Sequence, residues 1–75
     1  MKPYEQTMTI AHLRENVRPD AIQVIFLESA RFHWLLRINP AYDRLLPLLR
    51  EAVQTGRTVR VRWAAPDSEI IEDLP

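Results

Sequence analysis

Apolar residues in the middle of the chain recur at three- and four-residue spacing, which is the period of a helix with one buried face. These positions are Tyr42, Leu45, Leu46, Leu49, Ala52 and Val53. Asn39 suits the N-cap and Pro40 the first helical position, while Gly56, the only glycine in the chain, suits a left-handed helix end. The pattern predicts one helix over about residues 40–55, bent at the internal proline Pro47.

The segment before this helix alternates between apolar and polar positions, which is typical of two strands. The apolar sets are Ile22, Val24 and Phe26, followed by Phe32, Trp34, Leu36 and Ile38. A hairpin that keeps both sets on one face must pair Phe26 with Phe32, Val24 with Trp34 and Ile22 with Leu36. This register predicts a three-residue loop over 28–30, although no glycine is present there to adopt a left-handed conformation.

The segment after Gly56 repeats the alternation. Its apolar positions are Val59, Val61 and Trp63, and its polar ones are Thr58, Arg60 and Arg62. Residues 64–68 have the composition of a turn, with a Pro-Asp pair, and residues 69–74 predict a final edge strand. We therefore expect a second β-hairpin after the helix.

Two interpretations remain open for the N-terminal segment. Residues 1–8 are polar, and we expect them to be disordered. Three apolar residues then fall at helical spacing, namely Ile10, Leu13 and Val17, which favours a short helix over residues 9–17. The alternation of Met8 and Ile10 with threonines predicts a short strand instead.

Together these patterns predict one small α+β domain covering residues 1–75, in which two β-hairpins form an antiparallel sheet and the helix between them packs on one face. If residues 7–13 form a strand, the order becomes three strands, a helix and two strands. That order resembles the OB-fold, a small barrel that binds oligonucleotides and proteins, and the resemblance concerns the fold alone. The predicted core consists of Ile22, Val24, Phe26, Phe32, Trp34, Leu36, Leu45, Leu46, Leu49, Val53, Val59, Val61 and Trp63.

Composition narrows the functional classes. The chain has 75 residues, no cysteine, and ten basic residues balanced by ten acidic ones. Disulfides and thiolate zinc sites are therefore excluded, and a dedicated nucleic-acid binder would usually show a basic excess. No apolar run reaches membrane-spanning length and the N-terminus lacks the apolar segment of a signal peptide, so we expect a soluble, cytoplasmic protein without membrane contact.

No group of residues in the sequence forms a recognisable catalytic or metal site. A helix over 9–17 would place His12 and Glu15 on one face, but two ligands are too few for a metal without thiolates. Ser29 has His33 nearby in the sequence, yet strand residues four apart do not touch side by side, and no oxyanion motif accompanies the serine. We therefore expect a non-catalytic protein without a cofactor.

Self-association is the leading functional hypothesis from the sequence. The hairpin face opposite the predicted core is half apolar, with Ile25, Leu27 and Leu35, and a small core gains stability from a second subunit. We expect a protein-interaction module that forms a homo-oligomer, with a dimer favoured. The alternative is a module that binds single-stranded nucleic acid through Arg31, Arg37, Arg57, Arg60 and Arg62.

Overall fold

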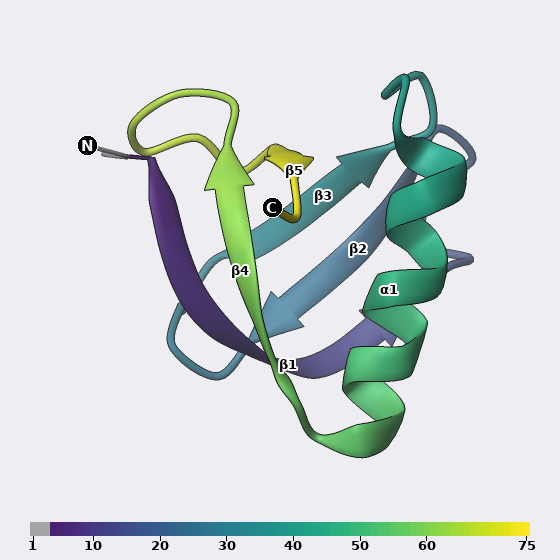
Figure 1. The fold of residues 1–75 in the computed structure, drawn as a ribbon. Coiled ribbons are helices and arrows are strands. Elements are labelled where there is room, and N and C mark those ends of the chain that lie inside the picture. Colours follow the sequence, from purple (N-terminus) through teal and green to yellow (C-terminus); the bar gives the residue numbers. More distant parts are fainter. Residues whose placement is uncertain (1–3) are drawn as a thin grey trace.

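The computed structural model describes residues 4–75, and this part of the chain forms five strands and one helix. The elements are β1 (Glu5–Arg14), β2 (Ala21–Phe26), β3 (Phe32–Leu36), α1 (Tyr42–Thr55), β4 (Thr58–Trp63) and β5 (Ile71–Asp73). The strands lie in the order β3-β2-β1-β4-β5, and every ladder between neighbours is antiparallel. The protein is a small α+β domain, as the sequence predicts, and its antiparallel sheet has five strands with one helix (Figure 1).

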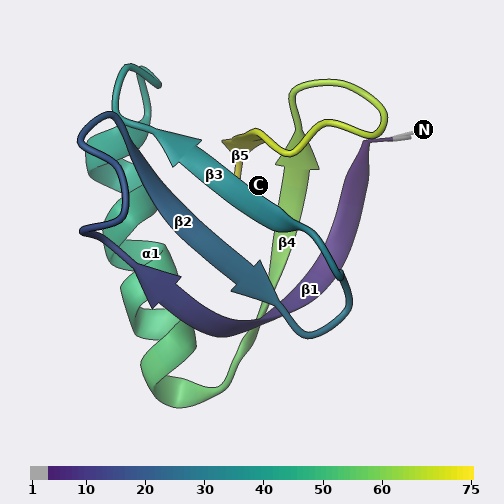
Figure 2. The same cartoon turned by 180° about the vertical axis from the view of Figure 1, so that it is seen from behind.

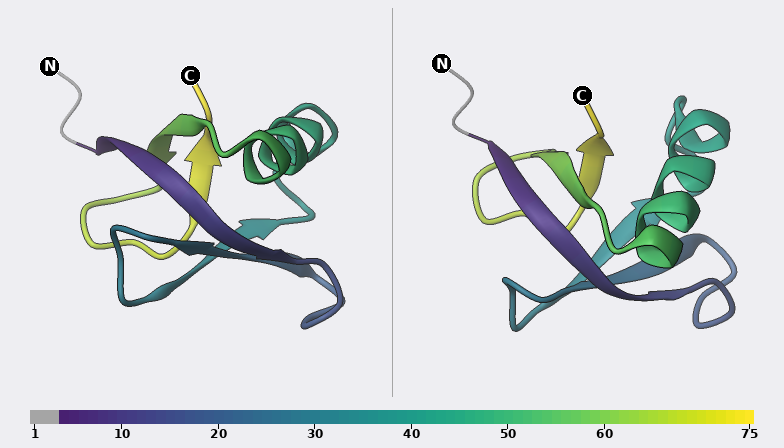
Figure 3. Two further views of the ribbon diagram at one scale, coloured as in Figure 1. Left: turned by 90° about the horizontal axis from the view of Figure 1, so that it is seen from below. Right: turned by 60° about the horizontal axis from the view of Figure 1, so that its bottom comes forward.

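The two outer strands of the sheet meet, so the sheet curls into a small barrel. Trp34 on β3 forms a parallel bridge with Ile70, just before β5, and its backbone N–H donates to the Glu69 carbonyl at 2.8 Å. The helix covers one end of this barrel, while the β2–β3 and β4–β5 loops lie toward the other end (Figure 3). Three strands, a helix and two strands in this order have the connectivity of an OB-fold barrel.

The N-terminal segment is a strand, and the helix predicted for residues 9–17 is wrong. β1 is the central strand and pairs with β2 on one side and β4 on the other. A β-bulge between Ile10 and His12 turns both Ile10 and Leu13 toward the core, because the extra residue resets the alternation of the strand. The bulge therefore produces the three-residue apolar spacing that resembles a helix.

Residues 5–8, predicted to be disordered, form the first part of β1 and pair with β4. Residues 1–3 lie outside the described part of the chain, so the prediction for them has no structural counterpart. Met8 is 4% exposed and belongs to the core. The N-terminal segment therefore contributes a central strand to the barrel.

The β2–β3 hairpin forms as predicted, but its register differs by one residue. Phe32 lies opposite Ile25, and Trp34 lies opposite Gln23. The connecting loop is longer than predicted, and Ser29 stabilises it by accepting a hydrogen bond from the Arg31 backbone N–H at 3.2 Å. A shift of one residue moves every side chain of a strand to the other face, so β3 turns His33 and Leu35 inward instead.

The helix agrees closely with its prediction. It is continuous through Pro47 and ends at Gly56, whose φ of 72° is the left-handed conformation expected there. Its first residue is Tyr42, two positions later than predicted. Asn39 is therefore not the N-cap but stabilises the preceding turn, where its side-chain oxygen accepts a hydrogen bond from the Ala41 N–H at 2.8 Å.

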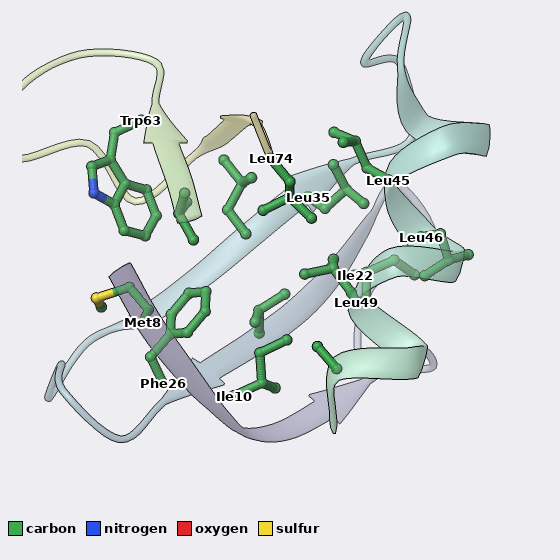
Figure 4. Packing of buried hydrophobic residues seen from close by; sticks show 14 residues of the cluster. Met8, Ile10, Ile22, Phe26, Leu35, Leu45, Leu46, Leu49, Trp63 and Leu74 are labelled. Carbon is green, nitrogen blue, oxygen red and sulfur yellow. The ribbon is translucent and has the colours of Figure 1, made fainter. Parts of the chain in front are cut away.

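The core lies between the barrel wall and α1, and Leu35 is in its centre (Figure 4). Its buried members are Met8, Ile10, Ile22, Val24, Phe26, Leu35, Leu45, Leu46, Leu49, Ala52, Val61, Trp63, Ile71 and Leu74. Most of the predicted core is confirmed, with Val53 and Val59 partly buried at its edge. The prediction is wrong for Phe32, Trp34 and Leu36, because the register of β3 turns them outward.

Candidate functional site

The strands β1, β2 and β3 place aromatic and basic side chains together on the outside of the barrel. The register aligns His12, Ile25 and Phe32 in one row across the three strands, and Arg14, Gln23 and Trp34 in the next. We call these six residues the outer face. Figure 2 shows the three strands in front of α1, from the side on which the outer face lies.

The two aromatic residues of the outer face stand two positions apart on β3, so both point away from the core. Phe32 is 53% exposed, and Trp34 is half-buried. The Arg18 guanidinium lies over the Trp34 ring, with its central carbon 4.7 Å from the ring centroid. Arg18 comes from the β1–β2 loop, so this loop folds back toward the aromatic residue of β3.

Arginines surround Trp34 with little opposing charge. Arg18 forms two hydrogen bonds to Asp20, at 2.9 and 2.6 Å, and this guanidinium lowers the pKa of the Asp20 carboxyl. Within residues 4–75, neither Arg14 nor Arg37 forms an ion pair. Glu15 also lies near Arg37, whose charge lowers the pKa of this carboxyl, so three arginines stand against two carboxylates and the region keeps a small basic excess although the whole chain is neutral.

Arg37 is held at the border of this region by Tyr42 of α1. Its Nη1 donates a hydrogen bond to the Tyr42 hydroxyl at 2.8 Å, and its guanidinium lies 5.5 Å from the tyrosine ring centroid. Arg18 and Arg37 both line a hollow of about 320 Å³ against the β1–β2 loop. Glu15, which also lines it, is bound by Arg50 of α1, and this hydrogen bond lowers the pKa of Glu15.

Gln23 differs from the other members of the outer face because it is buried. Its side chain is 5% exposed and lies between Arg14 and Trp34 in its row. Its Oε1 is buried and has no hydrogen-bond partner among the described residues. Native proteins rarely leave a buried amide oxygen unpaired, because the lost hydration is then not replaced.

The residues predicted to mediate self-association do not lie on one surface. Leu35 is fully buried in the core, whereas Leu27 is 70% exposed and Ile25 lies on the outer face. Phe32 takes the place of Leu35 on the surface, because the register of β3 exchanges its two faces. The apolar patch, as we call it, therefore consists of the exposed Leu27 and Phe32 and the partly buried Ile25.

The five arginines predicted to bind nucleic acid are also dispersed. Arg57 pairs with Glu51 at 3.3 Å, and Arg62 pairs with Glu5 at 3.2 Å and with Asp73 at 3.7 Å. Arg60 lies exposed on β4, and Arg31 donates through Nη1 to the Asp67 carbonyl at 3.0 Å. Of the five, Arg37 borders the basic region around Trp34.

Sequence reasoning missed Arg14 and Arg18. Treating residues 7–13 as a strand would have revealed Arg14, because it then alternates with Leu13 at the end of β1. No sequence signal placed Arg18 over Trp34, since that contact depends on the course of the β1–β2 loop.

A separate cleft of about 430 Å³ lies between the β2–β3 and β4–β5 loops. In it, Ser29 Oγ lies 2.9 Å from His33 Nε2, so the expectation that these residues do not touch is wrong. Ser29 belongs to the loop rather than to the strand, and the loop folds back over His33. The serine and the histidine thus have the spacing of a nucleophile and its base.

The environment of His33 does not resemble that of a catalytic base. Its Nδ1 is buried without a hydrogen-bond partner among residues 4–75, so no described carboxylate binds this nitrogen and orients the ring as in a catalytic triad. The ring packs against Trp63 at 4.5 Å and Phe26 at 5.4 Å between centroids. Burial lowers the pKa of His33, with a smaller contribution from the charge of Arg31, and the histidine is therefore part of an aromatic cluster in the core.

Comparison of the chain with family models, with curated proteins and with solved structures found no match. In the part of the chain that the structure describes, no three side chains of the metal-binding types come together as a metal site. The helix is too short and too polar to cross a membrane, and no other helix occurs in residues 4–75. Functional inference therefore depends on the chain's own residues and their geometry.

Proposed function

We propose that the chain is a non-catalytic module that binds single-stranded nucleic acid on the outer face and the arginines beside it. The observation that carries this proposal is the outward position of Phe32 and Trp34 beside Arg14 and Arg18. Aromatic side chains in a basic groove bind single strands in many small barrels, because every base offers a π-face for stacking. The neutral charge of the whole chain argued against nucleic-acid binding. That sum, however, includes arginines that are paired with carboxylates elsewhere in the fold.

The geometry supplies both components of such binding. Phe32 and Trp34 stand two residues apart on β3, which places their side chains about 7 Å apart on one face. A nucleobase can stack on Phe32, and another on Trp34 or on the guanidinium of Arg18 above it. Arg14 and Arg37 flank these positions and are available for phosphate groups, since neither forms an ion pair within residues 4–75.

Fluorescence anisotropy of a labelled single-stranded oligonucleotide tests the proposal. Three phosphate contacts by Arg14, Arg18 and Arg37 predict a slope of about −2 for the logarithm of the binding constant against the logarithm of salt concentration. Arg14→Ala should reduce this slope by about 0.7. Arg60→Ala, an exposed arginine on the opposite side of β1, is the matched control and should leave it unchanged. Absence of binding at low salt would contradict the proposal.

Self-association through the apolar patch is a second candidate function. The observation that favours it is the exposure of Leu27 at 70% and Phe32 at 53%, beside Ile25. Exposed apolar residues that adjoin one another are typical of protein contact sites, and a symmetric dimer would cover the same patch on both copies. Phe32 belongs to both candidate sites, so a dimer formed this way would compete with nucleic acid.

Light scattering over a concentration series tests this second candidate. We expect a dimer for the wild-type chain and a monomer for Leu27→Glu, because a charge would be buried in the contact. Leu48→Glu is the control, since Leu48 is 42% exposed on α1 and away from the patch. Self-association through this patch would be contradicted if the wild-type chain were a monomer at every concentration, or if Leu27→Glu were still a dimer.

A further inference from the structure

The buried amide oxygen of Gln23 has no hydrogen-bond partner among the described residues, and no other feature of the outer face accounts for a polar side chain at this position. A comparison with Gln6 makes the contrast clear. Gln6 on β1 is exposed, and its Oε1 accepts a hydrogen bond from the Trp63 indole at 2.8 Å. Gln23 is 5% exposed, and its Oε1 has no partner in residues 4–75. A leucine would fill the same position without this cost, so the amide destabilises the free protein.

The position of Gln23 is the place where a bound base would present its edge. In its row it lies between Trp34, the proposed stacking surface, and Arg14, a proposed phosphate contact. A base that stacks on Trp34 brings its hydrogen-bonding edge toward the neighbouring strand, and the residue opposite Trp34 on that strand is Gln23.

Stacking of a base on Trp34 requires Arg18 to move. The Arg18 guanidinium lies over Trp34, but its side chain is 41% exposed and its partner Asp20 is 59% exposed. An ion pair with this exposure contributes little to stability, so a base can replace the guanidinium on the ring. The released Arg18 then remains beside the strand, where it can contact a phosphate group.

We propose that Gln23 reads the base that stacks on Trp34, and that it selects adenine in single-stranded nucleic acid. This inference rests on the proposed binding function of the outer face. The glutamine amide offers an acceptor and a donor side by side, and adenine offers the complementary N6 amino group and ring nitrogen. Pairing with adenine would satisfy the Oε1 that is unpaired in the free protein. A purine also covers more of the tryptophan ring than a pyrimidine does.

The test compares binding of labelled oligo(dA) and oligo(dT) to the wild-type chain, to Gln23→Leu and to the control Gln6→Leu. The wild-type chain should prefer oligo(dA) by roughly ten-fold, the discrimination typical of one bidentate base contact. Gln23→Leu should bind both oligonucleotides about equally and keep the salt dependence. Gln6→Leu should keep the preference, because Gln6 lies at the other end of β1.

Thermal melting provides a second readout that does not depend on binding. Gln23→Leu should melt at a higher temperature than wild type, because it removes an unpaired buried amide. Gln6→Leu should melt at a lower temperature, because it leaves the Trp63 indole N–H without its partner.

Three further results would distinguish a failure of this inference from a failure of the function on which it rests. Salt-dependent binding of both oligonucleotides with no preference, unchanged by Gln23→Leu, would overturn the assignment of Gln23 and leave the nucleic-acid function standing. Failure to bind either oligonucleotide at low salt would overturn both. A preference for oligo(dT) that Gln23→Leu abolishes would overturn the selection of adenine.

Discussion

The two faces of β3 differ in chemistry although they alternate along five residues. His33 and Leu35 point inward and are 2% and 0% exposed, and they pack against Phe26, Trp63 and the core aliphatic residues. Phe32 and Trp34 point outward, where Phe32 is 53% exposed and the Arg18 guanidinium lies over the Trp34 ring. One strand thus supplies core side chains with one face and the proposed binding surface with the other.

This contrast shows that hydrophobicity alone does not identify the buried face of a strand. The outward face of β3 carries the larger aromatic residues, and the inward face carries a histidine. Shape decides the arrangement, because the tryptophan of β4 already fills the space beside His33 at 4.5 Å between ring centroids. A second indole at position 33 would not fit there without displacing Trp63.

Substitution of Leu35 should give the largest difference in stability between the inward and outward faces. Leu35→Ala removes a fully buried side chain and leaves a cavity, so it should lower the free energy of unfolding by about 2–5 kcal/mol. Leu27→Ala changes a residue that is 70% exposed and should cost about 0.5 kcal/mol or less. Urea denaturation of both variants measures the difference. Equal costs would mean that the inward position of Leu35 is wrong.

The pH dependence of stability should report the burial of His33. Because burial lowers its pKa, the unfolded chain binds a proton more readily than the folded one below the ordinary histidine pKa of about 6.5. Stability should therefore be constant above that pH and fall as the pH drops from about 6.5 toward 5. The carboxyl groups with lowered pKa values, such as Asp20 and Asp73, lose their contributions only at more acidic pH.

Thermal melting between pH 5 and 7 measures this effect. His33→Gln should remove the loss of stability in that range, whereas His12→Gln, which changes an exposed histidine on β1, should retain it. If His12→Gln removed the pH dependence and His33→Gln kept it, the burial of His33 would be contradicted.

Substitution of Trp34 should change stability less than substitution of Leu35 does, and it should separate the effect on stability from the effect on binding. Trp34→Ala removes a half-buried side chain on the outer face, so it should lower the free energy of unfolding by about 1 kcal/mol. The same change should weaken binding of a single-stranded oligonucleotide by about 1–3 kcal/mol, the usual loss for one stacked base. A variant that unfolds like Leu35→Ala would instead place Trp34 in the core.

The helix and the hairpins could be predicted from the sequence because their signals are local. The helix ends at Gly56, because glycine adopts the left-handed conformation without a steric penalty. The apolar stripe of α1 can be recognised from the spacing of residues within the helix alone. β1 could not be assigned with the same certainty. Its bulge between Ile10 and His12 gives a strand the apolar spacing of a helix, and pairing with two neighbours decides the outcome.

The candidate site could not be predicted because it depends on the register of β3. Both faces of residues 32–36 carry large apolar side chains, so alternation does not choose between them. The space beside Trp63 makes this choice, and the β2–β3 loop holds the same register, since Ser29 binds both His33 and the Arg31 backbone. The wrong register placed Leu35 on the surface and Trp34 in the core, so the sequence did not predict the outer face.

Acrylamide quenching of Trp34 fluorescence tests the central claim most directly, namely that β3 presents Trp34 outward as a binding surface. The Trp63→Phe variant leaves Trp34 as the only tryptophan of the chain. We expect acrylamide to quench Trp34 in the free protein and to quench it less once single-stranded oligonucleotide is added, because a stacked base covers the ring. A Trp34 that acrylamide cannot reach in the free protein, or whose quenching is unchanged by oligonucleotide at low salt, would contradict the claim.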